Sequence, residues 1–151
     1  MLFALQSELT AVDRFIEILQ REQAALISID INALMSITPE KLKQAELLNK
    51  MAQTRASSMA SRGIVNDRTQ VEAWLTTQAA ELTEAWHALI EAARTAQQLN
   101  QTNGILIETQ LKNNQQVLNT LVGAANQASV YGADGQARTS FSSTTRTLGK
   151  G

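Results

Sequence analysis

The sequence predicts an all-α protein: an antiparallel helical hairpin or bundle with coiled-coil packing, one long C-terminal helix and a flexible C-terminal tail. Three observations support this fold class. Pro39 is the only proline among 151 residues, and four of the seven glycines lie at or beyond Gly132. Alanine, leucine, glutamine and glutamate, all good helix formers, dominate residues 1–126. Apolar residues recur there at alternating steps of three and four, the period of packed helices.

The first helix is expected from residue 2 to about residue 27. Its seam steps by three and four over nearly four heptads, through Leu2, Leu5, Leu9, Val12, Ile16, Leu19, Gln23 and Leu26. Residues 28–37 are ambiguous, because Ile27, Ile29 and Ile31 alternate as in a strand while Asp30 is a suitable helix cap. We favour a connector with one helical turn, since a lone strand would have no partner.

The second helix is expected to begin at Thr38-Pro39-Glu40, where threonine can cap, proline suits the first helical position and glutamate faces the positive end of the dipole. Its seam runs through Leu42, Ala45, Asn49, Ala52, Ala56 and Met59, and Gly63 is a natural stop. Asn66 or Asp67 then caps a short amphipathic segment containing Val71, Trp74 and Leu75. This segment either merges into the next helix or ends near Gln78.

The last helix is expected from about Ala79 to Val122. Its seam passes through Leu82, Trp86, Leu89, Ala93, Ala96, Asn100, Asn103 and Ile107, then slips by one residue to Leu111, Asn114, Leu118 and Leu121. Between Gln97 and Gln127 only Glu108 and Lys112 are charged. Such a helix is either packed on two sides within its own bundle or partly reserved for a partner helix.

The domain organisation follows from a change in composition after Gly123. We expect a helical domain over residues 1–126 and a tail over residues 127–151. The tail is rich in glycine, serine and threonine, and we expect it to be mobile or unfolded when alone.

Composition and charge narrow the functional classes. The formal net charge is −1, which gives no support for a nucleic-acid or membrane-surface partner. The absence of cysteine excludes disulfides and thiolate metal sites. The apolar residues 1–5 follow no basic segment, so a signal peptide is not expected, and no apolar run is long enough for membrane insertion. We therefore expect a cytoplasmic protein.

The sequence offers little for catalysis. His87 is the only histidine, with Glu84 and Glu91 three residues before and four after it, and a histidine on a helix surface is the more common explanation. No zinc-protease or phosphate-loop motif is present. We expect no enzyme activity, no catalytic residues, no cofactor and no metal. Trp74 and Trp86 are expected to anchor the core, whereas Tyr131, the sole tyrosine, lies beyond the helices and suits docking.

Three segments carry a resemblance to a known family. They are Asn100-Gln101-Thr102-Asn103-Gly104 with Ile107-Glu108, Asn114-Gln115-Gln116-Val117-Leu118, and Val130-Tyr131-Gly132-Ala133-Asp134-Gly135-Gln136. At these residues the sequence resembles the FlgN family of flagellar type III export chaperones. The resemblance covers roughly residues 97–136; the first two helices match only in length and helical character.

The resemblance implies a cytosolic chaperone that binds the hook-filament junction (hook-associated) proteins, prevents their premature association and delivers them to the export gate. It implies cargo contacts on the long helix, for which the apolar seam offers Ile107, Leu111, Leu118, Leu121 and Val122. It also implies that Tyr131 docks on the cytoplasmic domain of the flagellar export gate. Two alternatives remain: a self-associating coiled-coil or adaptor protein, and a secretion chaperone for other cargo. Whether the free chain is a monomer or a homodimer stays open, as does the preferred junction protein.

Overall fold

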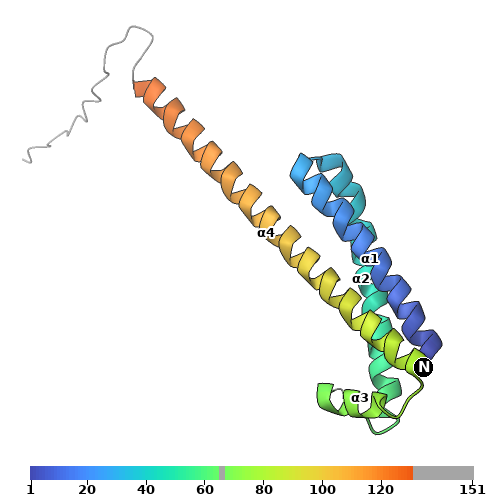
Figure 1. The fold of residues 1–151 in the computed structure, drawn as a ribbon. Coiled ribbons are helices and arrows are strands. Elements are labelled where there is room, and N and C mark those ends of the chain that lie inside the picture. Colours follow the sequence, from blue (N-terminus) through green and yellow to red (C-terminus); the bar gives the residue numbers. More distant parts are fainter. Residues whose placement is uncertain (65–66, 131–151) are drawn as a thin grey trace, which may run out of the picture. The chain divides into compact units, whose positions relative to one another are not determined.

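The computed structural model describes residues 1–64 and 67–130, apart from the side chains of Arg68 and of residues 125–130. Regular structure in these ranges is all helical and consists of α1 (Leu2–Ser28), α2 (Ile31–Ala60), α3 (Arg68–Leu75) and α4 (Ala80–Val130) (Figure 1). The all-α prediction is thus confirmed. The chain divides into two compact units, residues 1–108 and 109–151, and α4 contributes to both. No described helix combines the length and the apolar character needed to cross a membrane.

Helices α1 and α2 form an antiparallel hairpin, and α1 is buried along two flanks. Leu5, Val12, Leu19 and Leu26, which are every second member of the predicted seam, are buried, while the members between them are half-buried. A second buried flank consists of Glu8, Ala11, Ile18, Glu22 and Ala25. The buried surface is therefore broader than a two-stranded coiled-coil seam, as expected for a helix that packs against two neighbours.

The connection between α1 and α2 is only two residues long, so the expected connector over residues 28–37 is wrong. Ile29 adopts the left-handed conformation (φ 56°, ψ 38°) and ends α1, and the Asp30 N–H donates to the Ala25 carbonyl. The Asp30 carboxylate then accepts from the Ala33 N–H at 3.0 Å and caps α2. A capped helix start at Ile31 leaves no residues for a loop.

Pro39 lies inside α2 and does not begin it, which corrects the predicted start at Thr38-Pro39-Glu40. The Thr38 hydroxyl donates back to the Leu34 carbonyl at 2.8 Å, so it does not cap the helix. Proline inside a helix costs about 3 kcal/mol, because it has no N–H to donate and crowds the preceding turn. Here the helix continues because Ile37 is buried against Ile18 and Ala25 of α1.

The left-handed Ile29 leads to a stability prediction. A β-branched residue at positive φ is strained, and its side chain here is exposed, so it gains little from packing. Replacing Ile29 with glycine should raise the free energy of unfolding by about 1 kcal/mol in urea denaturation, since glycine adopts this conformation without a steric penalty.

Ile31→Gly is the matched control, because Ile31 is also exposed but has ordinary helical geometry at the start of α2. This control should lose about 0.5 kcal/mol of unfolding free energy through poor helix propensity. A loss of stability in Ile29→Gly similar to that in the control would show that Ile29 is not strained.

The inward face of α2 carries polar residues that join it to α1. Lys41 Nζ lies 2.8 Å from Glu22 Oε2, and Arg55 Nε lies 2.9 Å from Glu8 Oε2. These two ion pairs are separated by two heptads on each helix. Charged residues occupy inward positions on α2, so the predicted seam does not form the buried face. Its members Leu42, Ala45 and Asn49 are exposed, and only Met59 is fully buried.

The turn after α2 agrees with the sequence. Gly63 has a φ of 76°, and the Ile64 N–H donates to the Met59 carbonyl at 3.1 Å, so the chain stops as predicted. Asp67 caps α3 by accepting from the Thr69 and Gln70 N–H groups. Helix α3 ends at Leu75 and does not merge with α4.

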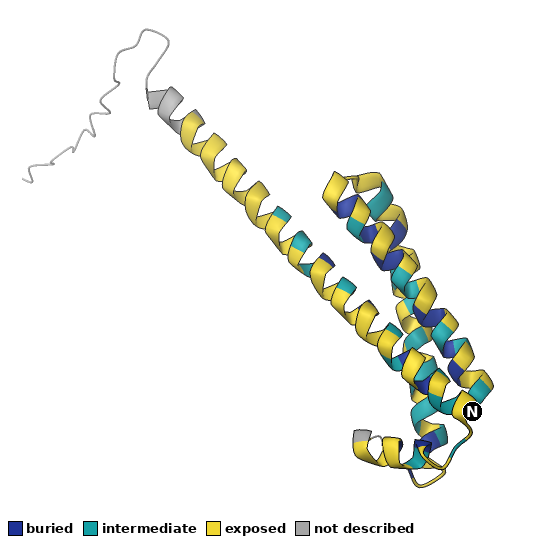
Figure 2. Cartoon of the chain, viewed as in Figure 1, coloured by how far each residue is buried: buried dark blue, intermediate teal, exposed yellow. Residues whose placement is uncertain are grey.

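The core of unit 1 joins all four helices (Figure 2). Its buried members include Leu5 and Leu19 of α1, Met59 of α2, Val71 and Leu75 of α3, and Trp86, Leu89 and Ala96 of α4. Trp86 is buried and Trp74 packs against the same cluster, as expected for core anchors. On α4 the predicted seam is half correct, because Leu89, Ala96 and Asn103 are buried whereas Ala93, Asn100 and Ile107 are exposed. Helix α4 extends to Val130, eight residues beyond the predicted end.

Candidate partner-binding site

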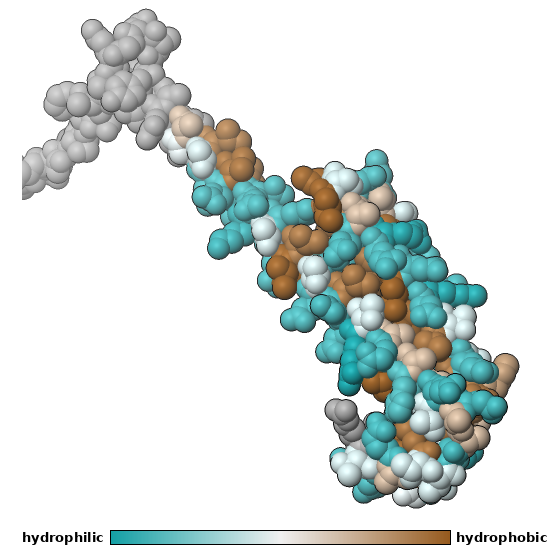
Figure 3. All heavy atoms as spheres, in the orientation of Figure 1, coloured by the Kyte–Doolittle hydropathy of each residue, from teal (hydrophilic) through white to brown (hydrophobic). Residues whose placement is uncertain are grey.

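Residues 109–124 of α4 carry an exposed apolar surface. Leu111, Val117, Leu118, Leu121 and Val122 are between 56% and 68% exposed. Leu111, Asn114, Leu118 and Leu121 are spaced by three, four and three residues, so they lie on one face of the helix. Lys112 is the only charged residue in this range. We call this surface, formed by Leu111, Val117, Leu118, Leu121 and Val122, the apolar stripe; apolar side chains are visible in brown along the part of α4 that precedes the grey atoms in Figure 3.

Four of the predicted cargo residues belong to this stripe, and each has its side chain exposed. They are Leu111, Leu118, Leu121 and Val122. The fifth, Ile107, lies in unit 1 and is 46% exposed. Tyr131, the predicted docking residue for the export gate, lies outside the described residues. The prediction that these residues contact partners is not tested by their exposure, but it requires exposure in the free protein.

Val117 was missed by the sequence reasoning although it is 58% exposed. It precedes Leu121 by four residues and therefore adjoins it on the helix surface. Val117 lies off the strict three-four seam, and a search for pairs of apolar residues four apart would have found it. Several exposed apolar side chains on a helical segment whose only charged residue is Lys112 form an unusual surface, and such surfaces commonly mark a binding site.

Asn103, a member of the predicted seam of the last helix, lies in a buried polar centre in unit 1. Its side chain is fully buried, and its Nδ2 donates to the Leu19 carbonyl at 2.9 Å and to Glu22 Oε2 at 2.8 Å. Lys41 Nζ contacts the same carboxylate at 2.8 Å and 3.0 Å. Among the described residues nothing donates a hydrogen bond to Asn103 Oδ1. Asn103, Glu22 and Lys41 therefore tie α4, α1 and α2 together at one level.

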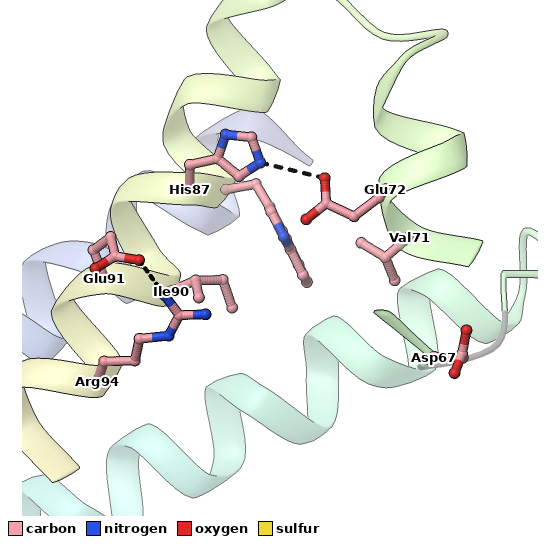
Figure 4. Close-up of a pocket in the computed structure, with 8 residues that line it drawn as sticks. Asp67, Val71, Glu72, His87, Ile90, Glu91 and Arg94 are labelled. Atoms are coloured by element: carbon pink, nitrogen blue, oxygen red, sulfur yellow. Dashed lines mark hydrogen bonds and ion pairs between the residues drawn. The ribbon is translucent and has the colours of Figure 1, made fainter. Parts of the chain in front are cut away.

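A surface pocket lies between α3 and α4 and contains the only histidine (Figure 4). His87 points across it toward Glu72 of α3, with 3.4 Å between Nε2 and Oε2. One turn further along α4, Arg94 pairs with Glu91. Val71, Trp86 and Ile90 supply apolar walls. Both contacts join exposed side chains, so they contribute little free energy.

This pocket does not assemble the ligand face considered from the sequence, in which Glu84 and Glu91 would flank His87. The partner of His87 is Glu72, and Glu91 is engaged by Arg94. Within residues 1–64 and 67–130 no group of three or more histidine, aspartate or glutamate side chains is suited to holding a metal ion. The described lining residues of the pocket include no serine, threonine or cysteine that could act as a nucleophile.

Comparison with known proteins defines the class to which this helical chain with an exposed stripe belongs. The model of the family described as FlgN protein matches residues 2–139. A relative from Salmonella typhimurium, named "Flagella synthesis protein FlgN", is 30% identical over 117 residues, which cover 78% of this chain and 74% of the relative. A protein of the same name from Proteus mirabilis is 31% identical over 140 residues, covering 91% and 89%. No solved structure matches the chain.

The chain therefore belongs to the FlgN family. The match extends well beyond residues 97–136, where the motif resemblance was found, and includes α1, α2 and α3.

Proposed function

We propose that this protein is a cytoplasmic flagellar export chaperone that binds hook-filament junction proteins before their secretion. Membership of the FlgN family supports a role in flagellar synthesis, since the relatives from Salmonella and Proteus carry that description. The observation that carries the proposal is the apolar stripe, which offers a long, nearly uncharged helical surface. The function is non-covalent binding, with no catalytic step.

The stripe suits amphipathic segments that fold only on assembly. A helix of the cargo would bury its apolar face against Leu111, Leu118 and Leu121, and this would keep the cargo from associating prematurely. The cargo loses conformational entropy as it orders, which holds the affinity at a moderate level and permits release at the export gate. Tyr131 is the residue proposed to dock on the cytoplasmic domain of the gate.

The first experiment is calorimetric titration of the full chain with a purified hook-filament junction protein. The double variant Leu111→Asp, Leu118→Asp should bind at least about tenfold more weakly than the parent chain, because two carboxylates would be desolvated in the contact. Absence of binding by the parent chain would refute the cargo proposal.

The control adds the same charges on the opposite face. Thr109 and Gln116 are exposed, are seven residues apart like the two leucines, and have no stripe residue three or four positions away. Thr109→Asp with Gln116→Asp should leave affinity within about twofold of the parent value. A chain ending at Asn126 then tests whether contacts also come from later residues, including Tyr131.

The alternative of self-association rests on the same stripe, because a second copy could also cover it. Sedimentation equilibrium of the free chain distinguishes the two. A stable homodimer that the two aspartates dissociate, with no affinity for junction proteins, would favour a structural coiled-coil or adaptor role.

A further inference from the structure

A groove in unit 1 separates α2 from α4, with α1 as its floor. It encloses about 320 Å³. Phe15 of α1 lies at its base, Leu48 and Ala52 form the α2 wall, and Ala93, Gln97 and Asn100 form the α4 wall. The three long helices therefore do not close around a filled centre on this side.

Both walls extend beyond the cavity in helical register. Ala45 precedes Ala52 by seven residues on α2 and lies on the same face of that helix, and both Ala45 and Asn49 are exposed. On the opposite wall, Ile107 follows Asn100 by seven residues and is exposed as well. The exposed seam residues Ala93 and Asn100 thus line the groove, and Ala45, Asn49 and Ile107 continue its walls along the two helices. Their heptad spacing is the pattern that a packed helix needs on the surface that receives it.

The residues that line the groove determine which kind of partner helix can bind in it. Alanines at positions 45, 52 and 93 let a neighbouring backbone approach closely, because interhelical distance depends on the side chains at the contact. Gln97 and Asn100 line the cavity with amides, and Asn49 adds another where the α2 wall continues. The only charged lining residues are Glu8 and Arg55, which pair with each other. An apolar helix of low charge fits this groove, whereas a charged helix would lose hydration without compensation.

We propose that this groove receives one amphipathic helix of low charge from the export cargo, which lies against α2 and α4 and completes a four-helix arrangement. This inference rests on the proposed function and adds α2 to the binding surface. Ile107 connects the two, because it follows the wall residue Asn100 by seven positions on α4 and belongs to the predicted cargo residues. Residues 131–151 of the chain itself are a poorer occupant, since they have only three large apolar residues, Tyr131, Phe141 and Leu148, and four glycines that disfavour a helix.

The test fills the groove from either wall. Ala45→Trp and Ala93→Trp each place a large side chain at an exposed alanine, and Ser57→Trp places the same side chain on a different, exposed face of α2. In calorimetric titration with a purified junction protein, both groove variants should bind at least about tenfold more weakly. The Ser57→Trp control should bind within about twofold of the parent chain.

A second pair of variants tests whether weaker binding could result from misfolding of the tryptophan variants. Asn49→Lys and Asn100→Lys introduce charge at exposed wall positions, and they should also weaken binding while the circular dichroism melting curve stays close to that of the parent. Parent-like affinity in all four variants would overturn the groove proposal and leave the chaperone function standing. Lack of binding by the parent chain would instead refute the function. A groove variant that changes the mass of the free chain in sedimentation would assign the groove to a second copy and overturn the proposal.

Discussion

The Arg55→Ala variant is expected to lose about 3 kcal/mol of unfolding free energy, because it leaves the buried Glu8 carboxylate without its partner. Arg55 Nε lies 2.9 Å from Glu8 Oε2, and the two side chains are only 19% and 7% exposed. The guanidinium also lies 5.2 Å from the ring centroid of Trp86, a cation–π contact that adds to the pair. Truncation would therefore weaken contacts to both α1 and α4. Urea denaturation measures the loss.

Arg21→Ala is the matched control. Arg21 also joins α1 to α2 through a glutamate, Glu40, at 2.8 Å, but these two side chains are 54% and 47% exposed. Exposed pairs contribute about 0–1 kcal/mol because water screens them and the long side chains lose entropy. Equal losses in the two alanine variants would show that burial does not govern the strength of these pairs.

Asn103→Asp is expected to lose at least about 3 kcal/mol of unfolding free energy at neutral pH. The substitution conserves shape but replaces the Nδ2 donor with an acceptor, which would then face the Leu19 carbonyl and the Glu22 carboxylate. Asn103 is fully buried, so water cannot compensate for the new repulsion. Thermal and urea denaturation should agree on the loss.

The same substitution at Asn100, three residues earlier on α4 and exposed, provides the comparison. Asn100→Asp should change stability by no more than about 0.5 kcal/mol. If Asn103→Asp were equally mild, the hydrogen bonds to Leu19 and Glu22 would contribute little to the position of α4.

The helical class and the extent of α1 could be predicted from the sequence, because residue composition and heptad spacing both indicated helix. The start of α2 could not, since Thr38-Pro39-Glu40 has favourable local chemistry for a first turn. Helix α2 nevertheless begins earlier, at Ile31, because Asp30 caps it there and because Ile37 is buried against α1. Tertiary contacts of this kind are invisible in a window of a few residues.

The candidate site was predicted in part. Heptad spacing identified Leu111, Leu118 and Leu121 as one face, but spacing alone does not distinguish a buried face from an exposed one. On α2 the same reasoning placed Leu42 inward although it is exposed. It missed Lys41 and Arg55, because a charged residue was assumed to face water. The groove between α2 and α4 could not be predicted, because helical spacing does not show which faces of two separate helices lie opposite each other.

The two ion pairs also determine which alignment of the hairpin is permitted. Apolar heptads are interchangeable, so α2 sliding along α1 by seven residues would again bring one apolar row against another. In one direction the slide would set Glu8 opposite Leu48, and in the other it would set Glu22 opposite Leu48, so a buried carboxylate would meet a hydrocarbon wall. The Glu8–Arg55 and Glu22–Lys41 pairs thus permit one register between α1 and α2 and disfavour the shifted ones. A repetitive sequence thereby acquires a single alignment, fixed nearer to the α1–α2 turn by Glu22–Lys41 and near the far end of the hairpin by Glu8–Arg55.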